Sequence, residues 1–367
     1  MAIIKLLYIV TNSDLGGISK YLLELTKGLP QNITPYFIMG SEGYLSEELR
    51  KLGIKDEQMY FVPMTNSISK ISEHIRAFCS IFKLIKQINP DLIHANATTA
   101  AVLCSACAAI TKIPTIYTVH GWPFTIGIPP KKQFFYKILE FFICKFFKKI
   151  ICVSEYDKQI GIKTLPMYKG KMLAIQNGIE DVPEEFIKKD FSQDELKMVM
   201  IARFCPQKDH YTLIYAVSEL VKEGYNIKLD FWGYGAQLDK FLNCVKEQNI
   251  DENIRYMGQI SNVTPILKNY DVYALISNWE GLPIGIIEAI RAGLPVLVTD
   301  VGGNSECVRE NGYIVKRQDV SDCKKQIKAL WDNRKDFAVM GQHSRKLYEE
   351  KFHTKIMTEQ TIKEYEI

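Results

Sequence analysis

Two glutamates that flank a glycine-rich loop carry the strongest chemical signal in the sequence. Glu280 and Glu288 enclose the run Gly281-Leu282-Pro283-Ile284-Gly285, which follows an apolar stretch and begins an amphipathic one. A strand, a loop and a helix in this order bring free backbone amides and the positive end of the helix dipole to one point. We expect a diphosphate to bind there, Glu288 to accept hydrogen bonds from a ribose, and Glu280 to hold a sugar hydroxyl. Taken alone, both acids are equally compatible with solvated positions at a helix start.

Further candidates lie at the ends of predicted strands in the first half of the chain. His120 ends one such strand and Gly121 follows it, so we expect its imidazole to face a ligand. Gly16 and Gly17 join the first strand to the first helix, where their amides can reach a diphosphate or an acceptor hydroxyl; the alternative is a tight turn without a ligand. His94 also ends a strand, and its pattern favours a hydrogen-bonded core position.

The elements that position these residues alternate between strand and helix. Short apolar or β-branched runs recur with amphipathic stretches between them, which is typical of βαβ units and a parallel sheet. The predicted strands of the first series are Lys5–Val10, Pro35–Met39, Tyr60–Pro63, Leu92–Ala95, Thr115–His120, Ile150–Ser154 and Met172–Gln176. Those of the second series are Lys197–Ala202, Lys228–Trp232, Ile254–Met257, Val272–Ile276 and Pro295–Thr299.

An acidic, strand-free stretch that starts at Glu180 separates the two series. We therefore predict an N-terminal domain over residues 1–185, a C-terminal domain over residues 186–350, and a C-terminal helix over residues 351–367 that packs back toward the N-terminal domain. The fold class is α/β, with two Rossmann-like doubly wound parallel sheets facing across a cleft. Ligands of such sheets bind beyond the carboxyl ends of the strands, so the cleft is the expected site.

Length, composition and charge agree with this organisation and exclude several classes of protein. A chain of 367 residues with 47% hydrophobic and 24% charged residues is globular and long enough for two domains. Its formal net charge of +4 is small and dispersed, so we expect no nucleic-acid partner. No run of about 20 apolar residues occurs, and the N-terminus is typical of a strand and not of a signal peptide, which favours the cytoplasm.

Neither the cysteines nor the acids indicate a metal site. The 9 cysteines are scattered, and the close pair Cys104 and Cys107 has no second pair to complete a zinc site, so we expect reduced core thiols. No Asp-x-Asp occurs, and no His/Cys/Asp cluster has ligand spacing. We therefore expect no metal and no other cofactor.

Taken together, the motifs resemble the retaining glycosyltransferases of the family 4 type (glycosyl transferases group 1), in the superfamily of sucrose synthase and glycogen synthase. The resemblance covers most of the chain and rests on the Glu280/Glu288 segment and on Leu15-Gly16-Gly17-Ile18, Thr118-Val119-His120-Gly121, Gln176-Asn177-Gly178-Ile179, Arg203 with Lys208, Gly233-Tyr234-Gly235, Ala292-Gly293-Leu294-Pro295-Val296 and Thr299-Asp300-Val301-Gly302-Gly303. It implies a GT-B fold whose N-terminal domain binds the acceptor and whose C-terminal domain binds the nucleotide sugar.

The resemblance also implies catalytic roles. In this family the bond between the anomeric carbon and the diphosphate breaks with retention of configuration, and cations hold the charge that develops on the leaving phosphate. Arg203 and Lys208 match those cations, and His120 matches a histidine that contacts the donor sugar. Ala202 and Asp209 stand where the family often has glycine, which puts only the local backbone path in doubt.

A basic and aromatic segment over residues 131–149 stands apart from these motifs. As a helix with about 100° per residue, it would place Lys137, Lys145 and Lys148 within a stripe of about 80° and fill much of the remainder with Phe and Ile. We expect it to lie on an anionic membrane surface through Lys131, Lys132, Lys137, Lys145, Lys148 and Lys149. The alternative is that the phenylalanines pack on the N-terminal sheet while the lysines extend into solvent.

The sequence thus predicts a peripheral enzyme on the inner face of the cell membrane. We expect a metal-independent, retaining transfer of a hexose from a nucleotide diphosphate sugar, UDP in preference to GDP, to a growing, lipid-linked glycan in surface polysaccharide biosynthesis. One alternative is a nucleotide-sugar 2-epimerase, against which the Glu280/Glu288 loop argues. Another is a catalytically silent binding partner of another transferase, which would not need Arg203, Lys208 and both glutamates.

Overall fold

The computed structural model describes residues 3–65, 67, 70–250 and 252–365, and the chain divides into two compact units. The first unit comprises residues 1–178 and 354–367, and the second comprises residues 179–353. The expected boundaries were 185/186 and 350/351. The chain passes into the second unit earlier because the start of the acidic stretch bonds to that unit: Arg291 Nη1 donates to the carbonyl of Glu180 (2.7 Å), and Arg345 Nη1 donates to Asp181 Oδ1 (2.7 Å).

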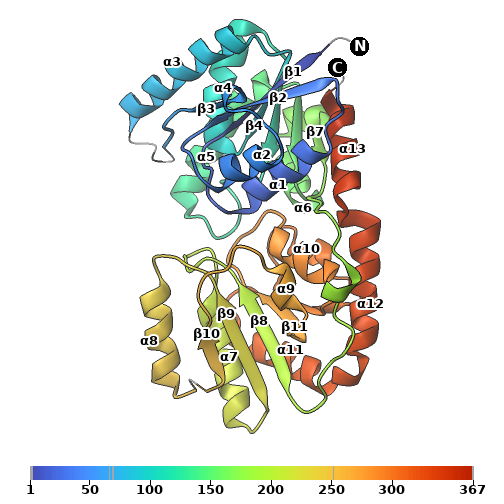
Figure 1. The fold of residues 1–367 in the computed structure, drawn as a ribbon. Coiled ribbons are helices and arrows are strands. Elements are labelled where there is room, and N and C mark those ends of the chain that lie inside the picture. The colour runs from blue at the N-terminus through green and yellow to red at the C-terminus, as the bar shows by residue number, and fades with distance from the viewer. Residues whose placement is uncertain (1–2, 66, 68–69, 251, 366–367) are drawn as a thin grey trace. The chain divides into compact units, whose positions relative to one another are not determined.

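The described part of the first unit is built on a seven-stranded parallel sheet with the order β3-β2-β1-β4-β5-β6-β7 (Figure 1). Its strands are β1 (Ile4–Val10), β2 (Ile33–Met39), β3 (Met59–Phe61), β4 (Leu92–Asn96), β5 (Thr115–Val119), β6 (Lys149–Cys152) and β7 (Met172–Ala174). Its α-helices are α1 (Gly17–Lys27), α2 (Tyr44–Lys51), α3 (Ile71–Ile88), α4 (Thr98–Thr111), α5 (Pro130–Ile143), α6 (Glu155–Thr164) and α13 (Thr354–Tyr365). The central strands β4 and β5 are buried along their whole length because helices cover both faces of a parallel sheet.

Side chains alternate between the two faces of this sheet, and the faces differ in chemistry. Ile93, Ala95, Tyr117 and Val119 belong to a large apolar core with residues of α3, α4 and α5. The intervening residues of β4 and β5 include polar side chains, and α1 and α13 pack against each other on their side. The Tyr365 hydroxyl of α13 lies 3.1 Å from the Tyr8 hydroxyl of β1, so the C-terminal helix is part of the first unit.

The described part of the second unit has a six-stranded parallel sheet with the order β10-β9-β8-β11-β12-β13. Its strands are β8 (Leu196–Ile201), β9 (Ile227–Trp232), β10 (Ile254–Tyr256), β11 (Val272–Leu275), β12 (Val296–Thr299) and β13 (Gly312–Val315). Its α-helices are α7 (His210–Lys222), α8 (Leu238–Gln248), α9 (Thr264–Leu267), α10 (Ile284–Arg291), α11 (Val320–Asp332) and α12 (Phe337–Leu347). The predicted α/β class with two doubly wound parallel sheets is therefore confirmed.

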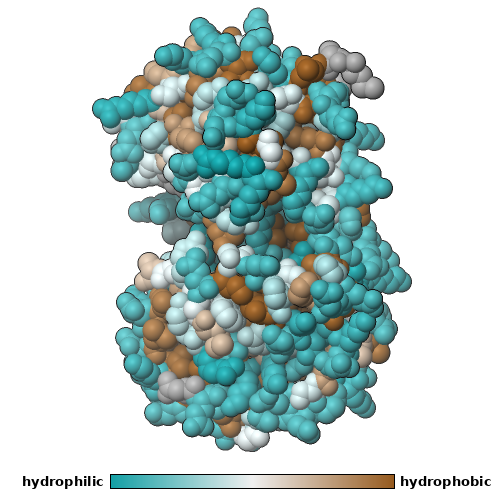
Figure 2. Space-filling view, in the orientation of Figure 1, coloured by the Kyte–Doolittle hydropathy of each residue, from teal (hydrophilic) through white to brown (hydrophobic). Residues whose placement is uncertain are grey.

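The exposed surface is that of an ordinary globular protein over most of the face in view. In Figure 2 hydrophilic residues dominate this face of each unit, and hydrophobic residues are scattered among them. Among the described helices, none combines the length and the apolar character needed to cross a membrane. The cysteines are free thiols, and all except Cys79 and Cys205 are buried.

Candidate active site

Two loops of the second unit are joined by backbone hydrogen bonds. The N–H of Asp209 donates to the carbonyl of Ile276 (2.9 Å), and the N–H of Asn278 donates to the carbonyl of Gln207 (2.7 Å). One loop follows β8 and the other follows β11, and these two strands are neighbours in the parallel sheet. Both loops therefore lie beyond the carboxyl ends of adjacent strands, where doubly wound sheets bind their ligands.

Lys208 and Glu280 meet where these loops meet. Lys208 Nζ donates a hydrogen bond to Glu280 Oε1, and Gln207 Nε2 donates to Glu280 Oε2 (3.1 Å) and to the carbonyl of Trp279 (3.0 Å). Both carboxylate oxygens of Glu280 are therefore held by donors from the first loop. Charge-assisted hydrogen bonds of this kind fix the orientation of the carboxylate.

Arg203 begins the first of these loops and is exposed. Its guanidinium makes no hydrogen bond or ion pair with any of the residues that the structure describes. These two loops therefore carry Lys208, which is held by a carboxylate, and Arg203, which has no partner among the described side chains. A guanidinium can bind two phosphate oxygens at once.

The glycine-rich loop lies at the N-terminus of α10. Pro283 precedes the first helical residue, Ile284, so the first-turn amides lack intrahelical partners. The backbone before the helix is held by the segment after β12: the N–H of Gly303 donates to the carbonyl of Gly281 (2.6 Å). Gly302 has φ +57°, and a Cβ there would lie 2.3 Å from the carbonyl oxygen of Glu280, so this close approach requires glycine.

Gly285 and Glu288 of α10 lie close to Tyr273, which belongs to strand β11 of the sheet beneath this helix. A Cβ on Gly285 would lie 2.4 Å from the hydroxyl of Tyr273, so packing alone explains this glycine. Tyr273 donates to the carbonyl of Ile201 (3.3 Å). Burial raises the pKa of Tyr273, and the nearby carboxylates of Glu288 and Glu280 raise it further. Glu288 is half-buried and lies three residues after Gly285 on α10, which puts it on the side of the helix that faces Tyr273.

His120 lies directly after β5 in the first unit and is half-buried. Its Nε2 is 3.1 Å from Oδ1 of Asn96, whose Nδ2 donates to the carbonyl of His94 (3.2 Å). Because an amide oxygen only accepts, this arrangement assigns the proton to Nε2 and leaves the lone pair on Nδ1. Burial lowers the pKa of His120 to about 3. At neutral pH the ring is therefore uncharged and offers an acceptor to a hydroxyl group.

Gly16 and Gly17 form the start of α1. Gly16 has an extended backbone, and a Cβ on Gly17 would meet no atom within 4 Å. Neither the backbone conformation nor the packing therefore requires glycine at position 17. Space beside the first turn of a helix leaves room for a ligand to approach the amides.

Known proteins identify the family of the chain. The family described as Glycosyltransferase Family 4 matches residues 15–181, and the family described as Glycosyl transferases group 1 matches residues 181–347. The chain belongs to the family 4 type of group 1 glycosyltransferases. The family resemblance predicted from the motifs is thus confirmed.

Two relatives of this glycosyltransferase have names that place them in the synthesis of bacterial glycans. An Escherichia coli relative is named UDP-Gal:alpha-D-GlcNAc-diphosphoundecaprenol alpha-1,3-galactosyltransferase; it is 26% identical over 340 residues, which cover 86% of this chain and 85% of the relative. The capsular polysaccharide biosynthesis glycosyltransferase CapH of Staphylococcus aureus is 26% identical over 83% of each chain.

Solved structures show that this glycosyltransferase has the GT-B fold. Anabaena HepE in complex with UDP-glucose has a TM-score of 0.81 at 16% identity, with 99% of each chain covered. Sucrose-phosphate synthase from Thermosynechococcus elongatus has a TM-score of 0.83 at 15% identity, with 99% of this chain and 98% of that chain covered.

Helix α5 of the glycosyltransferase buries a glutamate, Glu140, and exposes its phenylalanines to solvent. Phe134 and Phe142 are 68% and 62% exposed, and Phe135, Ile138, Phe141 and Phe146 are exposed as well. The buried residues of α5 are Glu140 and Ile143. This exposure contradicts the alternative that the phenylalanines of the segment pack on the sheet, except for Phe147, which is buried.

The segment does not form the continuous helix that the sequence predicted. Helix α5 ends at Ile143, a 3₁₀ turn covers Cys144–Phe146, and β6 starts at Lys149. Lys137, Lys145 and Lys148 therefore do not share one helical stripe. Lys149 forms an ion pair with Glu364 of α13 (2.8 Å), so it is not one of the lysines of an exposed helix. The helix ends before Lys149 because the apolar residues from Ile150 onward form β6, a buried strand of the sheet.

Glu140 is a buried carboxyl group within the apolar core. It accepts hydrogen bonds from Thr98 Oγ1 (2.9 Å) and from the hydroxyl of Tyr117 (3.2 Å), and Cys144 Sγ lies 3.8 Å from its other oxygen. Burial raises the pKa of Glu140 to about 7, and these hydrogen bonds oppose the rise.

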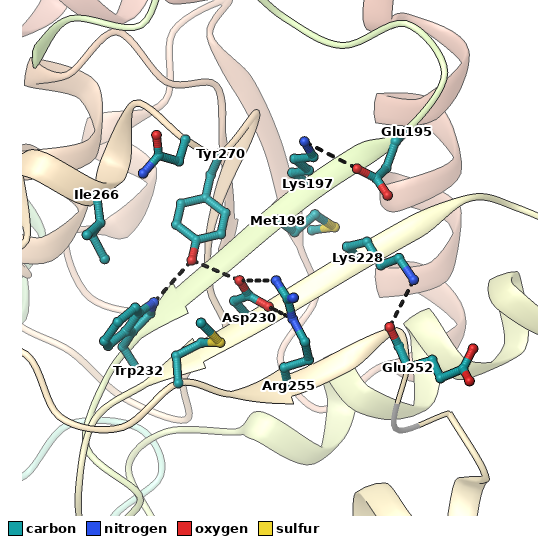
Figure 3. A pocket seen from close by; sticks show the side chains of 12 residues that line it. Glu195, Lys197, Met198, Lys228, Asp230, Trp232, Glu252, Arg255, Ile266 and Tyr270 are labelled. Atoms are coloured by element: carbon teal, nitrogen blue, oxygen red, sulfur yellow. Dashed lines mark hydrogen bonds and ion pairs between the residues drawn. The ribbon is translucent and has the colours of Figure 1, made fainter. Parts of the chain in front are cut away.

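A separate pocket of about 500 Å³ lies over β8, β9 and β10 of the second unit. Figure 3 shows its aromatic and apolar residues at one end and its charged residues at the other, namely Trp232, Tyr270 and Ile266 against Glu195, Lys197, Lys228 and Glu252. Asp230 between them accepts two hydrogen bonds from Arg255 (2.8 Å each) and one from Tyr270 (2.9 Å). None of the residues predicted as site residues lines this pocket.

Sequence reasoning missed residues that hold the predicted ones in place. Gln207 binds Glu280, Asn96 binds His120, and the ring of Tyr21 contacts the ring of His120 edge-on, with centroids 4.9 Å apart. The period-2 alternation of a strand could have indicated Asn96, because it puts residues 94 and 96 on one face. Among the described residues, no group of three or more His, Cys, Asp and Glu side chains could hold a metal ion.

Proposed function

We propose that this glycosyltransferase moves a hexose from a UDP-sugar, with retention of configuration and without a metal ion, to a lipid-linked glycan in surface polysaccharide biosynthesis. The donor binds the second unit and the acceptor binds the first. The E. coli relative whose name gives a UDP-Gal donor and a diphosphoundecaprenol-linked acceptor supports this proposal, as do solved neighbours in complex with UDP or UDP-glucose.

The observation that carries the proposal is the ion pair of Lys208 and Glu280 just before the N-terminus of α10, with the exposed Arg203 in the same loop as Lys208. When the bond between the anomeric carbon and the diphosphate breaks, negative charge develops on the leaving phosphate. Arg203, Lys208 and the first-turn amides of α10 stabilise that charge, which is the role that a divalent cation has in metal-dependent transferases. Glu280 accepts a hydrogen bond from a sugar hydroxyl, and Glu288 accepts from the ribose.

His120 and the first glycine loop complete the proposed machinery. The neutral imidazole of His120 offers its Nδ1 to a hydroxyl of the donor sugar and orients it, while Asn96 holds the ring. The amides of Gly16 and Gly17 bind the diphosphate or the acceptor hydroxyl. In this proposal His120 is not the general base; the departing phosphate oxygen takes the proton of the acceptor hydroxyl.

A thermal-shift and hydrolysis screen tests the donor site without any acceptor. The purified protein is mixed with UDP, GDP, UDP-galactose, UDP-glucose, UDP-N-acetylglucosamine or a GDP-sugar, each with and without EDTA. We expect UDP and one UDP-sugar to raise the melting temperature by ligand linkage, and that UDP-sugar to release UDP slowly, both unchanged by EDTA. Stabilisation by GDP alone would overturn the donor class, and a loss of stabilisation in EDTA would overturn metal independence.

We also propose that the exposed side of α5 binds the cytoplasmic face of an anionic membrane, which brings the enzyme to its lipid-linked acceptor. The large apolar side chains of this surface are Phe134, Phe135, Ile138, Phe141 and Phe142, and its cations are Lys131, Lys132 and Lys137 of α5 and Lys145 of the 3₁₀ turn that follows, all of them exposed. Burial of each aromatic ring in the interface contributes on the order of 1 kcal/mol or more, and each lysine near anionic lipid about 1 kcal/mol.

Co-sedimentation with vesicles tests this surface. The wild type is expected to bind vesicles of phosphatidylglycerol and phosphatidylcholine more strongly than vesicles of phosphatidylcholine alone, and less strongly at high salt. Replacing Phe134 and Phe142 together by Ser should weaken binding by tenfold or more, because about 2 kcal/mol of apolar burial is lost. Val339→Ser, which removes a half-exposed apolar side chain from α12 of the second unit, is the matched control and should bind like the wild type. Equal binding by the double variant would refute the proposal.

A further inference from the structure

A continuous chain of polar side chains runs through the interior of the first unit. The hydroxyls of Tyr8 and Tyr365 are 3.1 Å apart, the Tyr365 hydroxyl is 3.0 Å from Nδ1 of His94, and Nε2 of His94 is 2.6 Å from Oγ1 of Thr118. Thr118 Oγ1 lies 3.4 Å from the hydroxyl of Tyr21. All of these side chains are buried. The proposed function uses none of them, although His94 was a candidate from the sequence.

The directions of the hydrogen bonds in this chain depend on one another. Burial lowers the pKa of His94 to about 3, so its ring is neutral and has one donor and one acceptor nitrogen. If the Tyr365 hydroxyl donates to Nδ1, then Nε2–H donates to Thr118, and the Thr118 hydroxyl is free to donate to Tyr21. If Nδ1 carries the proton instead, every bond in the chain reverses. Whether the Tyr365 hydroxyl donates to Nδ1 of His94 or accepts from it therefore decides whether the Thr118 hydroxyl donates to Tyr21 or accepts from it.

The chain ends at the residues that hold His120. The ring of Tyr21, whose hydroxyl meets Thr118, contacts the His120 ring with an interplanar angle of 78°. On the other side Asn96 links the His94 carbonyl to Nε2 of His120. His120 is thus supported by two neighbours, and each of them bonds to a residue of the buried chain. Buried networks in which every member is bonded are rigid and specify one arrangement.

The distal member of the chain comes from a distant part of the sequence. Tyr365 lies on α13, whereas His94, Thr118 and Tyr21 lie on β4, β5 and α1. The ring of Tyr365 also packs edge-on against that of His94, with centroids 5.7 Å apart and an angle of 77°. If α13 served only to cover the sheet, an apolar side chain at position 365 would be sufficient and would avoid the desolvation of a phenol.

We propose that Tyr365 is a positioning residue for the sugar-binding histidine: its hydroxyl fixes the tautomer of His94 and, through Thr118 and Tyr21, the orientation of His120. This inference rests on the proposed role of His120. It assigns to the C-terminal helix a function in the reaction, in addition to its contribution to the fold of the first unit.

The experiment compares Tyr365→Phe with a matched control in the full-length protein. Tyr348→Phe is the control, because the buried Tyr348 hydroxyl donates to the carbonyl of Ile179 in the second unit (3.0 Å). Each variant removes one buried hydroxyl; the Tyr365 hydroxyl bonds to both Tyr8 and His94, so we expect both variants to lose thermal stability and Tyr365→Phe to lose at least as much as the control. Nitrogen-15 NMR of the 6 histidines, assigned with His→Gln variants, reports the tautomers of His94 and His120. Steady-state release of UDP from the turned-over UDP-sugar gives kcat and KM.

We expect Tyr365→Phe, but not Tyr348→Phe, to change the imidazole signals of both His94 and His120 and to lower kcat by about tenfold with little change in KM. Thr118→Val tests the same link if Tyr365→Phe folds poorly, and Thr118→Ser should restore the wild-type signals and kcat. Unchanged His120 signals in both Tyr365→Phe and Thr118→Val would overturn the inference. If Tyr365→Phe and Thr118→Val alter the signals but His120→Ala turns over normally, the proposed role of His120 falls, and the inference falls with it. If His120→Ala loses activity but Tyr365→Phe and Thr118→Val keep the wild-type kcat, the inference about Tyr365 is overturned and the proposed role of His120 stands.

Discussion

Lys208 and Glu280 form an ion pair whose two side chains are only 11% and 7% exposed. The pair joins the loop after β8 to the loop after β11, and Gln207 holds the second oxygen of the same carboxylate. A pair so far removed from solvent fixes its loops only while both charges are present, because each of them would be costly to bury alone. The same lysine is available to a phosphate if that phosphate competes with Glu280.

Replacing Arg203 or Lys208 by Ala should lower turnover of the UDP-sugar by about 10²-fold or more each, because each removes a cation from the leaving phosphate. Rates of UDP release, with circular dichroism to check the fold, measure the effect. Lys240→Ala removes an exposed lysine from α8 of the same unit and should retain wild-type turnover. Wild-type rates in both Arg203→Ala and Lys208→Ala would contradict the assignment of the leaving-group site.

The ion pair should also appear in a double-mutant cycle of stability. Lys208→Met leaves a buried carboxylate with Gln207 as its remaining side-chain donor, so we expect a loss of about 3 kcal/mol. Glu280→Gln leaves a buried ammonium and should cost a comparable amount. Denaturant unfolding of the single variants and of Lys208→Met/Glu280→Gln measures the coupling, and the double variant should lose clearly less than the two single losses together. Additive losses would mean that the pair contributes nothing beyond its separate parts.

Gly17→Ala separates ligand approach from folding. The new methyl group meets no protein atom within 4 Å, and alanine is the better helix former, so stability should stay the same or rise by about 0.5–1 kcal/mol. If a substrate approaches the amides of this turn, the methyl group blocks it, and turnover should fall by tenfold or more. Gly170→Ala, in the same unit and also with open space around the added methyl, should keep normal turnover. Equal rates for the two variants would argue against a ligand at Gly17.

Glu140 should make the first unit less stable as the pH rises. Its pKa in the folded protein is raised from 4.5 to about 7, so the folded state binds the proton more tightly than the unfolded state. Stability from this group is complete below pH 4.5 and is lost as the pH rises through 7, by on the order of 3 kcal/mol. Denaturant unfolding between pH 4.5 and 8 should therefore show a smaller decline in Glu140→Gln than in the wild type. Parallel pH profiles for the two proteins would contradict this prediction.

The two series of strands were predictable because buried parallel strands are continuous apolar runs with β-branched residues. β13 was missed, since it is a four-residue edge strand that begins with Gly312 and has half-exposed side chains. The length of α5 was wrong because hydropathy does not show where a helix yields to a strand: Ile150 and Ile151 are as apolar as the helix before them.

The candidate site was predictable where local sequence carries the chemistry. Residues 281–285 and the flanking glutamates form a strand-loop-helix segment, so short spacing was enough to place them. The contacts of Lys208 with Glu280 and of His120 with Asn96 join residues that are far apart in sequence, and only the pairing of β8 with β11 and of β4 with β5 brings them together. Gly285, expected at a ligand, is explained by its packing on Tyr273.

The division of the first unit between residues 1–178 and 354–367 has a consequence for biosynthesis. The second unit is contiguous in the chain and can fold as it leaves the ribosome. Most of the first unit is synthesised earlier, but its folding cannot be completed then, because α13 is translated only after the whole second unit. Until then the hydroxyl of Tyr8 and Nδ1 of His94 lack the partner that Tyr365 provides. The nascent sheet therefore lacks part of the cover of one face while the second unit is translated, and its hydrogen bonds to Tyr365 form only after that unit has been made.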